Sequence, residues 1–333
     1  HVTDRRQRQM CIRDREKNFL ISADLIVHRV VHGGTKYRHA SLLDLEVKQF
    51  IRDMIPLART HHPASLACIE EITEHFPEIP QAVVFDTSFH QTLPEYAWRY
   101  ALPRKISDQY AIRRYGFHGI SHQSVVKQAA SFLKTPVNKL NLITIHLGNG
   151  ASISAIKKGI CVDTTMGMTP LEGLVMGTRP GDLDPGILTL LAREGWNQEA
   201  LETMLNQDSG MKGLCGTNDF REILQNKEEG NEEAEMALEL YCYRVRKTIG
   251  SFNTVIGPVD ALVFTGGVGE NVSWVRKRSV RGMEWMNIQL DPDMNDHAEA
   301  PCAIHSKDSQ TKILVLPSDE EWEMASQAAE LIL

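Results

Sequence analysis

Two glycine-rich segments in this sequence follow runs of apolar residues, and both have the residue types that bind phosphate. They are HLGNGAS (146–152) and FTGGVGEN (264–271). A turn at the end of a strand leaves consecutive backbone N–H groups facing outward, and glycine lets an anion approach them closely. Neither segment has the Lys-Ser/Thr of a Walker A loop or the glycine spacing of a dinucleotide-binding turn. Each alone is more often a structural turn, but two of them suit a nucleotide held between two lobes.

Arginines and histidines offer further contacts to anions. Arg29 in HRVVHGG and Arg179 in GTRPGD lie beside glycines, and guanidinium groups pair well with carboxylates and phosphates. Eleven of the 13 histidines fall within the first 146 residues. His118 and His122 are four residues apart, but the glutamate of a zinc-protease helix is missing and Gly119 weakens a helix there. We therefore favour a polar, anion-binding cleft over a catalytic zinc site.

Three carboxylates stand at positions where chemistry is common. Asp86 follows the apolar run VVF, and an acid at a strand end either acts in a site or caps a turn. Glu320 and Glu321 follow LVLPSD at the start of the last expected helix. Acids in a first helical turn are favoured by the helix dipole alone. That simpler interpretation is expected to hold for one of the two glutamates.

The elements that must position these residues alternate between strands and helices. Apolar, largely β-branched runs predict buried strands within 23–34, 81–89, 141–150 and 259–271. Apolar residues at helical spacing predict helices at 64–76, 121–134, 231–257 and 319–333, and 290–301 is expected to be irregular. Alternation of this kind indicates an α/β protein. We expect an N-terminal lobe at 18–137, a C-terminal nucleotide-binding lobe at 138–333, and an atypical leader at 1–17.

The composition excludes several classes of protein. Of the 333 residues, 42% are hydrophobic and 24% charged, and the net charge of -7 argues against binding to nucleic acid or to a membrane surface. The six cysteines form no C-x-x-C pair, which indicates reduced thiols rather than disulfides or a zinc site. The sequence contains no apolar run long enough for a membrane span and no signal peptide. A cytoplasmic location is expected.

In this order, the segments resemble the acetate kinase family, a branch of the actin/hexokinase superfamily. The similarity covers residues 25–333, and the run from His146 to Pro185 is specific to that family. It rests on HRVVHGG, VVFDTSFHQTLPEYAWRYALP, RRYGFHGISH, HLGNGAS, VDTTMGMTPLEGLVMGTRPGDLDPG, DFRE, FTGGVGEN and PSDEEWEMA. The resemblance implies a two-lobed actin/hexokinase-like (ribonuclease H-like) fold, with mixed sheets flanked by helices.

The resemblance also implies an activity. The γ-phosphoryl group of ATP would pass to acetate by direct in-line transfer with Mg²⁺ or Mn²⁺, giving acetyl phosphate and ADP, and the reaction would also run in reverse. The protein would be a homodimer that pairs through its C-terminal lobe. A sugar kinase or a heat-shock-type ATPase of the same superfamily is a weaker alternative.

Site residues follow from the family's motifs, position by position. Arg29, Asp86, His118 and Arg179 match the catalytic set, and Glu320 matches the acid associated with magnesium. Substrate binding falls to Arg29, His61 and Asp86, while His122 has a less certain role in the same motif as His118. The residues that match nucleotide and phosphate contacts are His146, Gly148, Asn149, Gly150, Asp219, Phe220, Arg221, Gly267, Val268, Gly269 and Asn271.

The sequence departs from the family's pattern in two places. The family begins with a strand that leads into an Asn-x-Gly-Ser-Ser-Ser-x-Lys loop, and no such segment precedes Arg29 here. The N-terminal lobe is therefore expected to be incomplete, with 1–17 either a solvated leader or non-native, and a catalytically silent nucleotide-binding fragment is an alternative. In ARTHHPAS (58–65), Thr60 replaces an apolar residue of the acetyl pocket, so a propionate kinase is a second alternative.

Overall fold

The computed structural model describes residues 23–59 and 61–333, so the expected leader at 1–17 and Thr60 lie outside the described residues. The N-terminal part is built on a three-stranded sheet in the order β1-β3-β2. Strand β1 (Ile26–Val30) runs parallel to β3 (Gln81–Phe85), and the short β2 (Ser41–Leu42) runs antiparallel to it. All five residues of β3 are buried, as the apolar run predicts for a strand covered on both faces.

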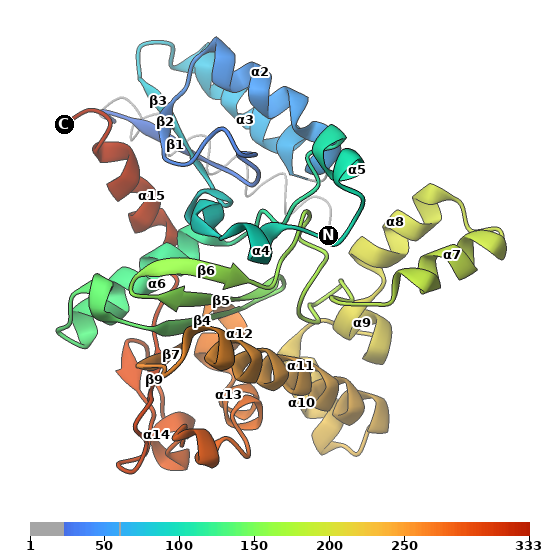
Figure 1. The fold of residues 1–333 in the computed structure, drawn as a ribbon, viewed down its shortest axis with the longest axis vertical. Helices are drawn as coiled ribbons and strands as arrows, with labels where there is room; N and C mark the ends of the chain where they lie inside the picture. Colours follow the sequence, from blue (N-terminus) through green and yellow to red (C-terminus); the bar gives the residue numbers. More distant parts are fainter. Residues whose placement is uncertain (1–22, 60) are drawn as a thin grey trace.

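Helices cover both faces of this first sheet. On one face, α2 (Leu45–Asp53) and α3 (His62–His75) pack against Val83 and Phe85. On the other face, Val84 packs near Met324 of the last helix, α15 (Glu320–Ala329). Figure 1 shows α15 lying beside β1 and β3, so the end of the chain completes the first layer.

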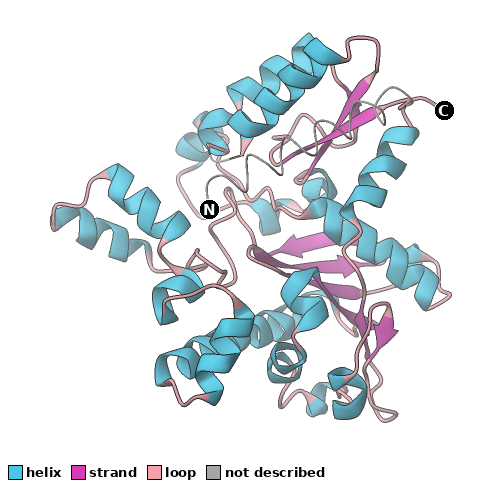
Figure 2. Ribbon diagram, turned by 180° about the vertical axis from the view of Figure 1, so that it is seen from behind, coloured by secondary structure: helices cyan, strands magenta, loops and turns pink. Residues whose placement is uncertain are grey.

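The second sheet has six strands in the order β6-β5-β4-β7-β9-β8. Its parallel strands are β4 (Leu142–Leu147), β7 (Ala261–Thr265) and β9 (Lys312–Val315). Its antiparallel strands are β5 (Ala151–Lys157), β6 (Ile160–Thr164) and β8 (Cys302–Ala303). Helix α11 (Glu232–Ile256) packs on one face and α6 (Gly119–Phe132) on the other, so both sheets are mixed and flanked by helices (Figure 2).

Helix α11 is the longest helix in the described part of the chain, and its sequence accounts for both of its ends. The side chain of Asn231 accepts a hydrogen bond from the backbone N–H of Ala234, and three glutamates occupy the first turn. Acids there are stabilised by the helix dipole. At the other end Gly257 has φ 83°, a conformation that glycine adopts without strain.

The four expected strands and four expected helices are confirmed, with three differences in detail. Helix α6 begins at Gly119 rather than at Ser121, because Gly119 donates a backbone hydrogen bond to the carbonyl of Asp86 and Ser121 does not serve as the cap. The segment 264–271 is not a long glycine turn, since Gly266 alone has positive φ and helix α12 (Gly266–Asn271) follows at once. The segment 290–301 contains α14 (Pro292–Asp296).

The remaining elements are short, and several lie in segments for which the sequence analysis predicted no element. They are η1 (Ile55–Leu57), η2 (Ser88–Thr92), α4 (Glu95–Trp98), α5 (Arg104–Gln109), η3 (Val137–Lys139), α7 (Pro185–Arg193), α8 (Gln198–Gln207), α9 (Gly210–Cys215), α10 (Phe220–Glu228), α13 (Ser273–Ser279) and η4 (Glu284–Met286). Helices α7 and α8 project from the rest of the molecule (Figure 1). Within the described ranges, no helix has both the length and the apolar character needed to cross a membrane.

Candidate active site

The expected site residues gather where parallel strands of the two sheets end. Asp86 directly follows β3, the glycines of the HLGNG segment begin directly after β4, and Gly266 follows β7. Glu320 comes five residues after the end of β9, at the first position of α15. Ligands in α/β proteins bind at the carboxyl ends of parallel strands, so this topology collects residues from distant parts of the chain.

Arg29 lies between two carboxylates. Its Nε and NH2 groups donate to Oδ1 and Oδ2 of Asp86, each at 2.9 Å, and its NH1 group donates to Oε2 of Glu320 at 2.8 Å. Arg29 lies in β1, within the expected strand that runs toward Gly33 and Gly34, and the register places it opposite Val84 of β3. The strand therefore fixes its backbone, and the bidentate pair with Asp86 fixes its guanidinium group.

The ion pairs around Arg29 shift the protonation of their members. Burial alone would lower the pKa of Arg29, but the charges of Asp86 and Glu320 outweigh it and raise this pKa further. Burial and the negative charge of Asp86 raise the pKa of Glu320, while Arg29 opposes that rise. The Oε1 atom of Glu320 is buried and has no hydrogen-bond partner among the described residues. An unpartnered carboxylate oxygen beside a second carboxylate is a suitable ligand for a hard cation.

His118 is held in an unusual backbone conformation just before α6. It has φ 56° and ψ 24°, in the left-handed region that costs a non-glycine residue on the order of 1 kcal/mol. The next residue explains this geometry, because a Cβ at Gly119 would lie 2.1 Å from the carbonyl oxygen of Asp86. The turn before α6 therefore packs closely against the end of β3, and His118 and Asp86 lie in the same part of the site.

The glycine loop after β4 meets His118 and Arg179. A Cβ at Gly150 would lie 2.8 Å from the NH2 atom of Arg179 and 3.0 Å from Nε2 of His118. The NH1 group of Arg179 donates to the carbonyl oxygen of Pro170 at 2.6 Å, which orients its guanidinium group. The His118 ring stacks on that of His146, with ring centroids 4.3 Å apart.

The histidines of this region are neutral at pH 7. Burial and the neighbouring imidazoles of His146 and His122, together with Arg29 and Arg179, lower the pKa of His118 well below its usual range. Burial, followed by the charge of Arg29, lowers the pKa of His146 to about 4. His61 has a lowered pKa for similar reasons, namely burial first and then the charge of Arg179.

Asn149 and Gly148 lie on the solvent-facing side of the same loop. The Oδ1 atom of Asn149 accepts a hydrogen bond from Nδ2 of Asn218 at 2.9 Å, and its carbonyl accepts one from the backbone of Gly177. The HLGNG loop is therefore tied both to the segment around Arg179 and to the segment before α10. Gly148 N–H bonds to the carbonyl of Gly150, which closes the turn.

The residues expected at adenosine lie at the start of α10 and in α12. Asp219 caps α10 by accepting from the backbone of Arg221, and the two side chains also pair on the surface. Phe220 is buried in the C-terminal core, edge-on to Tyr241, so it supports this surface from behind. In α12, Gly267 and Asn271 are exposed, and Asn271 donates to the carbonyl of Gly267.

Val268 and Gly269 are both buried within α12. A Cβ at Gly269 would lie 3.6 Å from the carbonyl oxygen of Ile145 in β4, so this residue packs the helix against the sheet. These two residues therefore hold α12 in place, while Gly267 and Asn271 form its accessible side.

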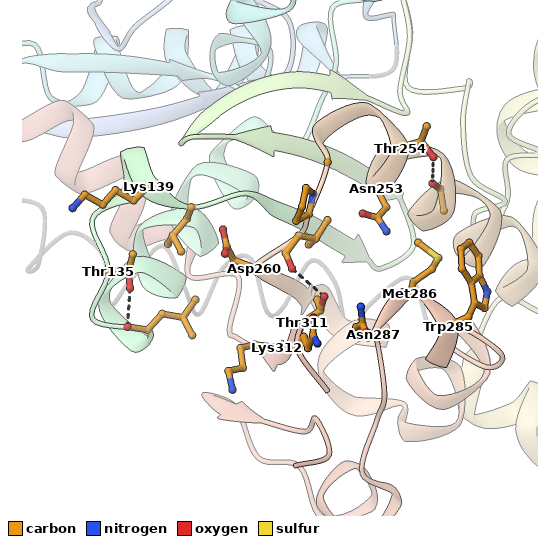
Figure 3. Close-up of a pocket in the computed structure, with 17 residues that line it drawn as sticks. Thr135, Lys139, Asn253, Thr254, Asp260, Trp285, Met286, Asn287, Thr311 and Lys312 are labelled. Carbon is orange, nitrogen blue, oxygen red and sulfur yellow. Dashed lines mark hydrogen bonds between the residues drawn. The ribbon is translucent and has the colours of Figure 1, made fainter. Parts of the chain in front are cut away.

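A cavity of about 410 Å³ lies at this site, between the ends of β1 and β3, the start of α6 and the segment around Arg179. It is lined by Arg29, Asp86, His118 and Arg179 together with His61, Val31, Ala64, Ser65, Phe117 and Pro170. A larger hollow of about 1010 Å³ lies elsewhere, around Lys139, Asp260, Trp285 and Lys312 (Figure 3). It contains none of the expected site residues and borders the opposite, amino-terminal ends of β4, β7 and β9.

Some residues that shape this site were not singled out in the sequence. Glu270 accepts hydrogen bonds from the backbone of Gly266 and of Ser318, so it joins the start of α12 to the segment before Glu320. Ser152 contacts His118 and His122, and Ser121 contacts His146. Glu270 could have been found from the sequence, because it is an acid four residues after a glycine that ends a strand. A serine within a strand, such as Ser152, gives no such signal.

Fold and site together define a class of protein. Two α/β layers, a glycine loop after β4, the glycine-led helix α12 after β7, and converging arginines, a histidine and two carboxylates characterise a phosphotransferase of the actin/hexokinase-like fold. The pattern that defines the acetokinase family matches residues 8–326, and the chain belongs to this family.

Similar proteins agree with this assignment. An acetate kinase of Sulfurovum sp. (strain NBC37-1) is 51% identical over 308 residues, which cover 92% of this chain and 78% of the relative. The crystal structure of an acetate kinase from Porphyromonas gingivalis superposes with a TM-score of 0.89 at 42% identity, covering 93% of this chain and 78% of the other. A propionate kinase from Francisella tularensis superposes with a TM-score of 0.90 at 41% identity, covering 94% and 80%. These matches confirm the resemblance and the expected fold class.

Proposed function

We propose that this protein transfers the γ-phosphoryl group of ATP to acetate, giving acetyl phosphate and ADP, and catalyses the reverse reaction. The observation that carries the proposal is the 410 Å³ cavity, where two arginines and a histidine meet a small apolar wall formed by Val31, Phe117 and Pro170. A short carboxylic acid has this combination of a charged end and an apolar methyl group.

The roles of the catalytic residues follow from the charges of the reactants. Acetate is already ionised at pH 7, because a carboxylic acid of this kind has a pKa near 4–5, so no general base is needed. Catalysis then consists of aligning two anions and stabilising the charge on the transferring phosphoryl group. Arg29 and Arg179 hold the anions, and neutral His118 donates a hydrogen bond to a phosphoryl oxygen. Removing one such contact typically costs on the order of 3 kcal/mol in the barrier.

Asp86 and Glu320 would hold Mg²⁺, or Mn²⁺, together with the phosphates of the nucleotide. The unpartnered Oε1 of Glu320 and the closeness of both carboxylates to Arg29 support this assignment. When bound, the cation would neutralise part of the phosphate charge. In the described ranges no group of three or more His, Cys, Asp and Glu side chains is arranged to bind a metal, so most ligands would come from nucleotide and water, as is usual for Mg²⁺.

The nucleotide would lie between the HLGNG loop and α12. Its phosphates would meet His146, Gly148, Asn149 and Gly150, and its adenosine would meet Asp219, Arg221 and the exposed side of α12. By the same family likeness, we propose a homodimer in the cytoplasm, with pairing through the C-terminal part.

Propionate is a second candidate acceptor, favoured by the superposition on the propionate kinase from Francisella tularensis. Thr60, which the sequence places near the acyl pocket, lies outside the described residues. ADP formation measured with a coupled assay, with acetate, propionate or no acceptor, tests both. We expect acceptor-dependent ADP formation, with kcat/KM higher for acetate and the acyl phosphate trapped by hydroxylamine. Equal rates with and without acceptor, or no turnover, would refute the proposal.

A further inference from the structure

A layer of hydroxyl groups is buried between the six-stranded sheet and α6. Thr144 of β4 and Ser152 and Ser154 of β5 are fully buried, and Thr164 of β6 is 1% exposed. The other face of the same strands carries Ile143, Ile145, Ile153 and Ala155, which belong to the core beneath α11. A buried hydroxyl without a hydrogen bond destabilises the fold, so a polar face inside a core has to be compensated by hydrogen bonds.

Three of these hydrogen bonds form a chain that ends in the catalytic cavity. Thr144 Oγ1 lies 2.8 Å from Nδ1 of His122, and Nε2 of His122 lies 2.8 Å from Oγ of Ser152. Ser152 Oγ lies 2.9 Å from Nδ1 of His118. The remaining ring nitrogen, Nε2 of His118, faces the Gly150 backbone and Arg179. We call Thr144, His122, Ser152 and His118 the hydroxyl–imidazole chain.

Counting protons restricts this chain to two arrangements. Both imidazoles are neutral, so each has one N–H, and the hydroxyl of Ser152 can donate to one histidine only. Either Ser152 donates to Nδ1 of His118 and accepts from Nε2 of His122, or both of these bonds are reversed. The tautomers of the two histidines are therefore coupled.

Thr144 decides between the two arrangements. In the first, its hydroxyl donates to Nδ1 of His122 at 2.8 Å, and the protons of Thr144, His122 and Ser152 all have short acceptors. In the second, Nδ1 of His122 donates to Thr144, whose own proton is left with the carbonyl of Ser154 at 3.5 Å. That separation is too long for an O–H···O hydrogen bond, so the first arrangement is favoured.

We propose that Thr144, His122 and Ser152 are positioning residues that keep the proton of His118 on Nε2, where it donates into the phosphoryl site. This inference rests on the proposed role of His118. Only His118 contacts the substrate, and the other three members act through it. Stacking of the His118 ring on His146, whose Nδ1 lies 2.8 Å from Oγ of Ser121, keeps the ring from turning over. Loss of tautomer control over a catalytic histidine lowers kcat by orders of magnitude in serine proteases.

Nitrogen NMR of the full chain with ¹⁵N-labelled histidine tests the proposal, because the two neutral tautomers have distinct ¹⁵N shifts. His118→Asn and His122→Asn variants assign the two signals. We expect protonated Nε2 on both His118 and His122. Protonated Nδ1 on His118 would overturn the proposal.

The isosteric variant Thr144→Val removes the deciding hydroxyl, and Thr144→Ser restores it. We expect Thr144→Val to raise the Nδ1-protonated fraction of both histidines together and to lower kcat about tenfold or more, with KM for ATP and acetate within twofold. Thr144→Ser should recover both properties. Ser154→Ala is the control, because its hydroxyl bonds to Thr164 outside the chain. Unchanged tautomers in Thr144→Val, or a change confined to His122, would contradict the coupling.

The tautomer measurement needs no turnover, so it separates this inference from the proposed function. If the protein has the expected tautomers but shows no acceptor-dependent ADP formation, the proposed function is refuted and the inference about the tautomers stands.

Discussion

Arg29 joins the two carboxylates of the site. One guanidinium group contacts both oxygens of Asp86 and one oxygen of Glu320, so residues from the first strand and the last helix are held together by a single side chain. Two carboxylates near each other repel, and a cation between them offsets that repulsion. The second oxygen of Glu320 stays unpartnered among the described residues, which leaves a place for a further cation.

Glu320→Gln tests the assignment of this oxygen. Glutamine keeps the size of the side chain but removes the charge, so we expect the affinity for Mn²⁺ in the presence of ADP to fall about tenfold or more. Electron paramagnetic resonance measures this binding without requiring turnover. Because burial raises the pKa of Glu320, the affinity of the unchanged protein should also begin to fall at a higher pH than an ordinary glutamate would give.

The neighbouring residue supplies the control for this variant. Glu321 is exposed in the same first turn of α15, so Glu321→Gln should leave Mn²⁺ binding unchanged. Equal effects of the two substitutions would mean that general charge near the helix start, rather than Glu320 itself, attracts the cation.

Among the elements, the contact between the end of β3 and the turn that begins α6 positions two catalytic residues at once. Gly119 donates to the carbonyl of Asp86 at 2.9 Å and leaves no room for a side chain there. His118 takes its left-handed conformation because the chain must enter α6 from this close approach. The position of Asp86 at the end of β3 and the position of His118 before α6 therefore depend on the same contact.

Two glycine-to-alanine variants should show opposite effects on the free energy of unfolding. Gly119→Ala places a Cβ 2.1 Å from the Asp86 carbonyl, so we expect a loss of about 1–3 kcal/mol and a lower kcat. Gly250→Ala, inside α11, meets no atom within 4 Å, so we expect a gain of about 0.5–1 kcal/mol and unchanged kcat. Urea unfolding measures both. A Gly119→Ala protein of normal stability and activity would refute our account of the turn.

The sequence predicted the main strands and helices because their apolar periodicity is strong. It also placed Asp86, the HLGNG loop and Glu320 correctly at strand ends or helix starts. It missed the roles of Ser152 and Thr144, since serine and threonine occur in ordinary strands and only the fold brings α6 above them. The start of α6 was missed for a similar reason, because Gly119 is disfavoured in an isolated helix and is required here by a contact with Asp86.

At the scale of the whole molecule, α6 lies between the two sheets and α15 returns to the first one. Two side-chain pairs join these helices, namely Lys127 with Glu323 and Gln123 with Gln327, and Gln128 donates to the carbonyl of Pro317 just before α15. A group of neutral, buried histidines lies in the same central region, so the stability of the whole fold should depend on pH.

We expect the free energy of unfolding to fall as the pH drops from about 6.5 toward 4. Burial, opposed in part by a hydrogen bond with the Phe117 carbonyl, lowers the pKa of His90 to about 4, and burial and Arg29 lower that of His146 to about 4. Between these values and the ordinary value of 6.5, the unfolded chain binds protons that the folded chain does not. The contribution of each such histidine to the free energy of unfolding is therefore fully present above pH 6.5. As the pH falls below 6.5, the free energy of unfolding decreases by about 1.4 kcal/mol per pH unit for each such histidine.

Urea unfolding at several pH values measures this slope. His90→Gln should reduce this slope by the contribution of one histidine, because glutamine does not titrate. A stability that is flat between pH 7 and 5 would contradict the neutral state of the buried histidines.

In the proposed reaction, a carboxylate oxygen of acetate attacks the γ-phosphorus directly. Turnover of ATP with ¹⁸O-labelled acetate, followed by ³¹P NMR of the product, tests it most directly. We predict acetyl phosphate whose phosphorus carries the isotope shift of one bonded ¹⁸O atom. ADP accompanied only by unlabelled inorganic phosphate would mean that water is the acceptor, and that result would contradict the proposed function.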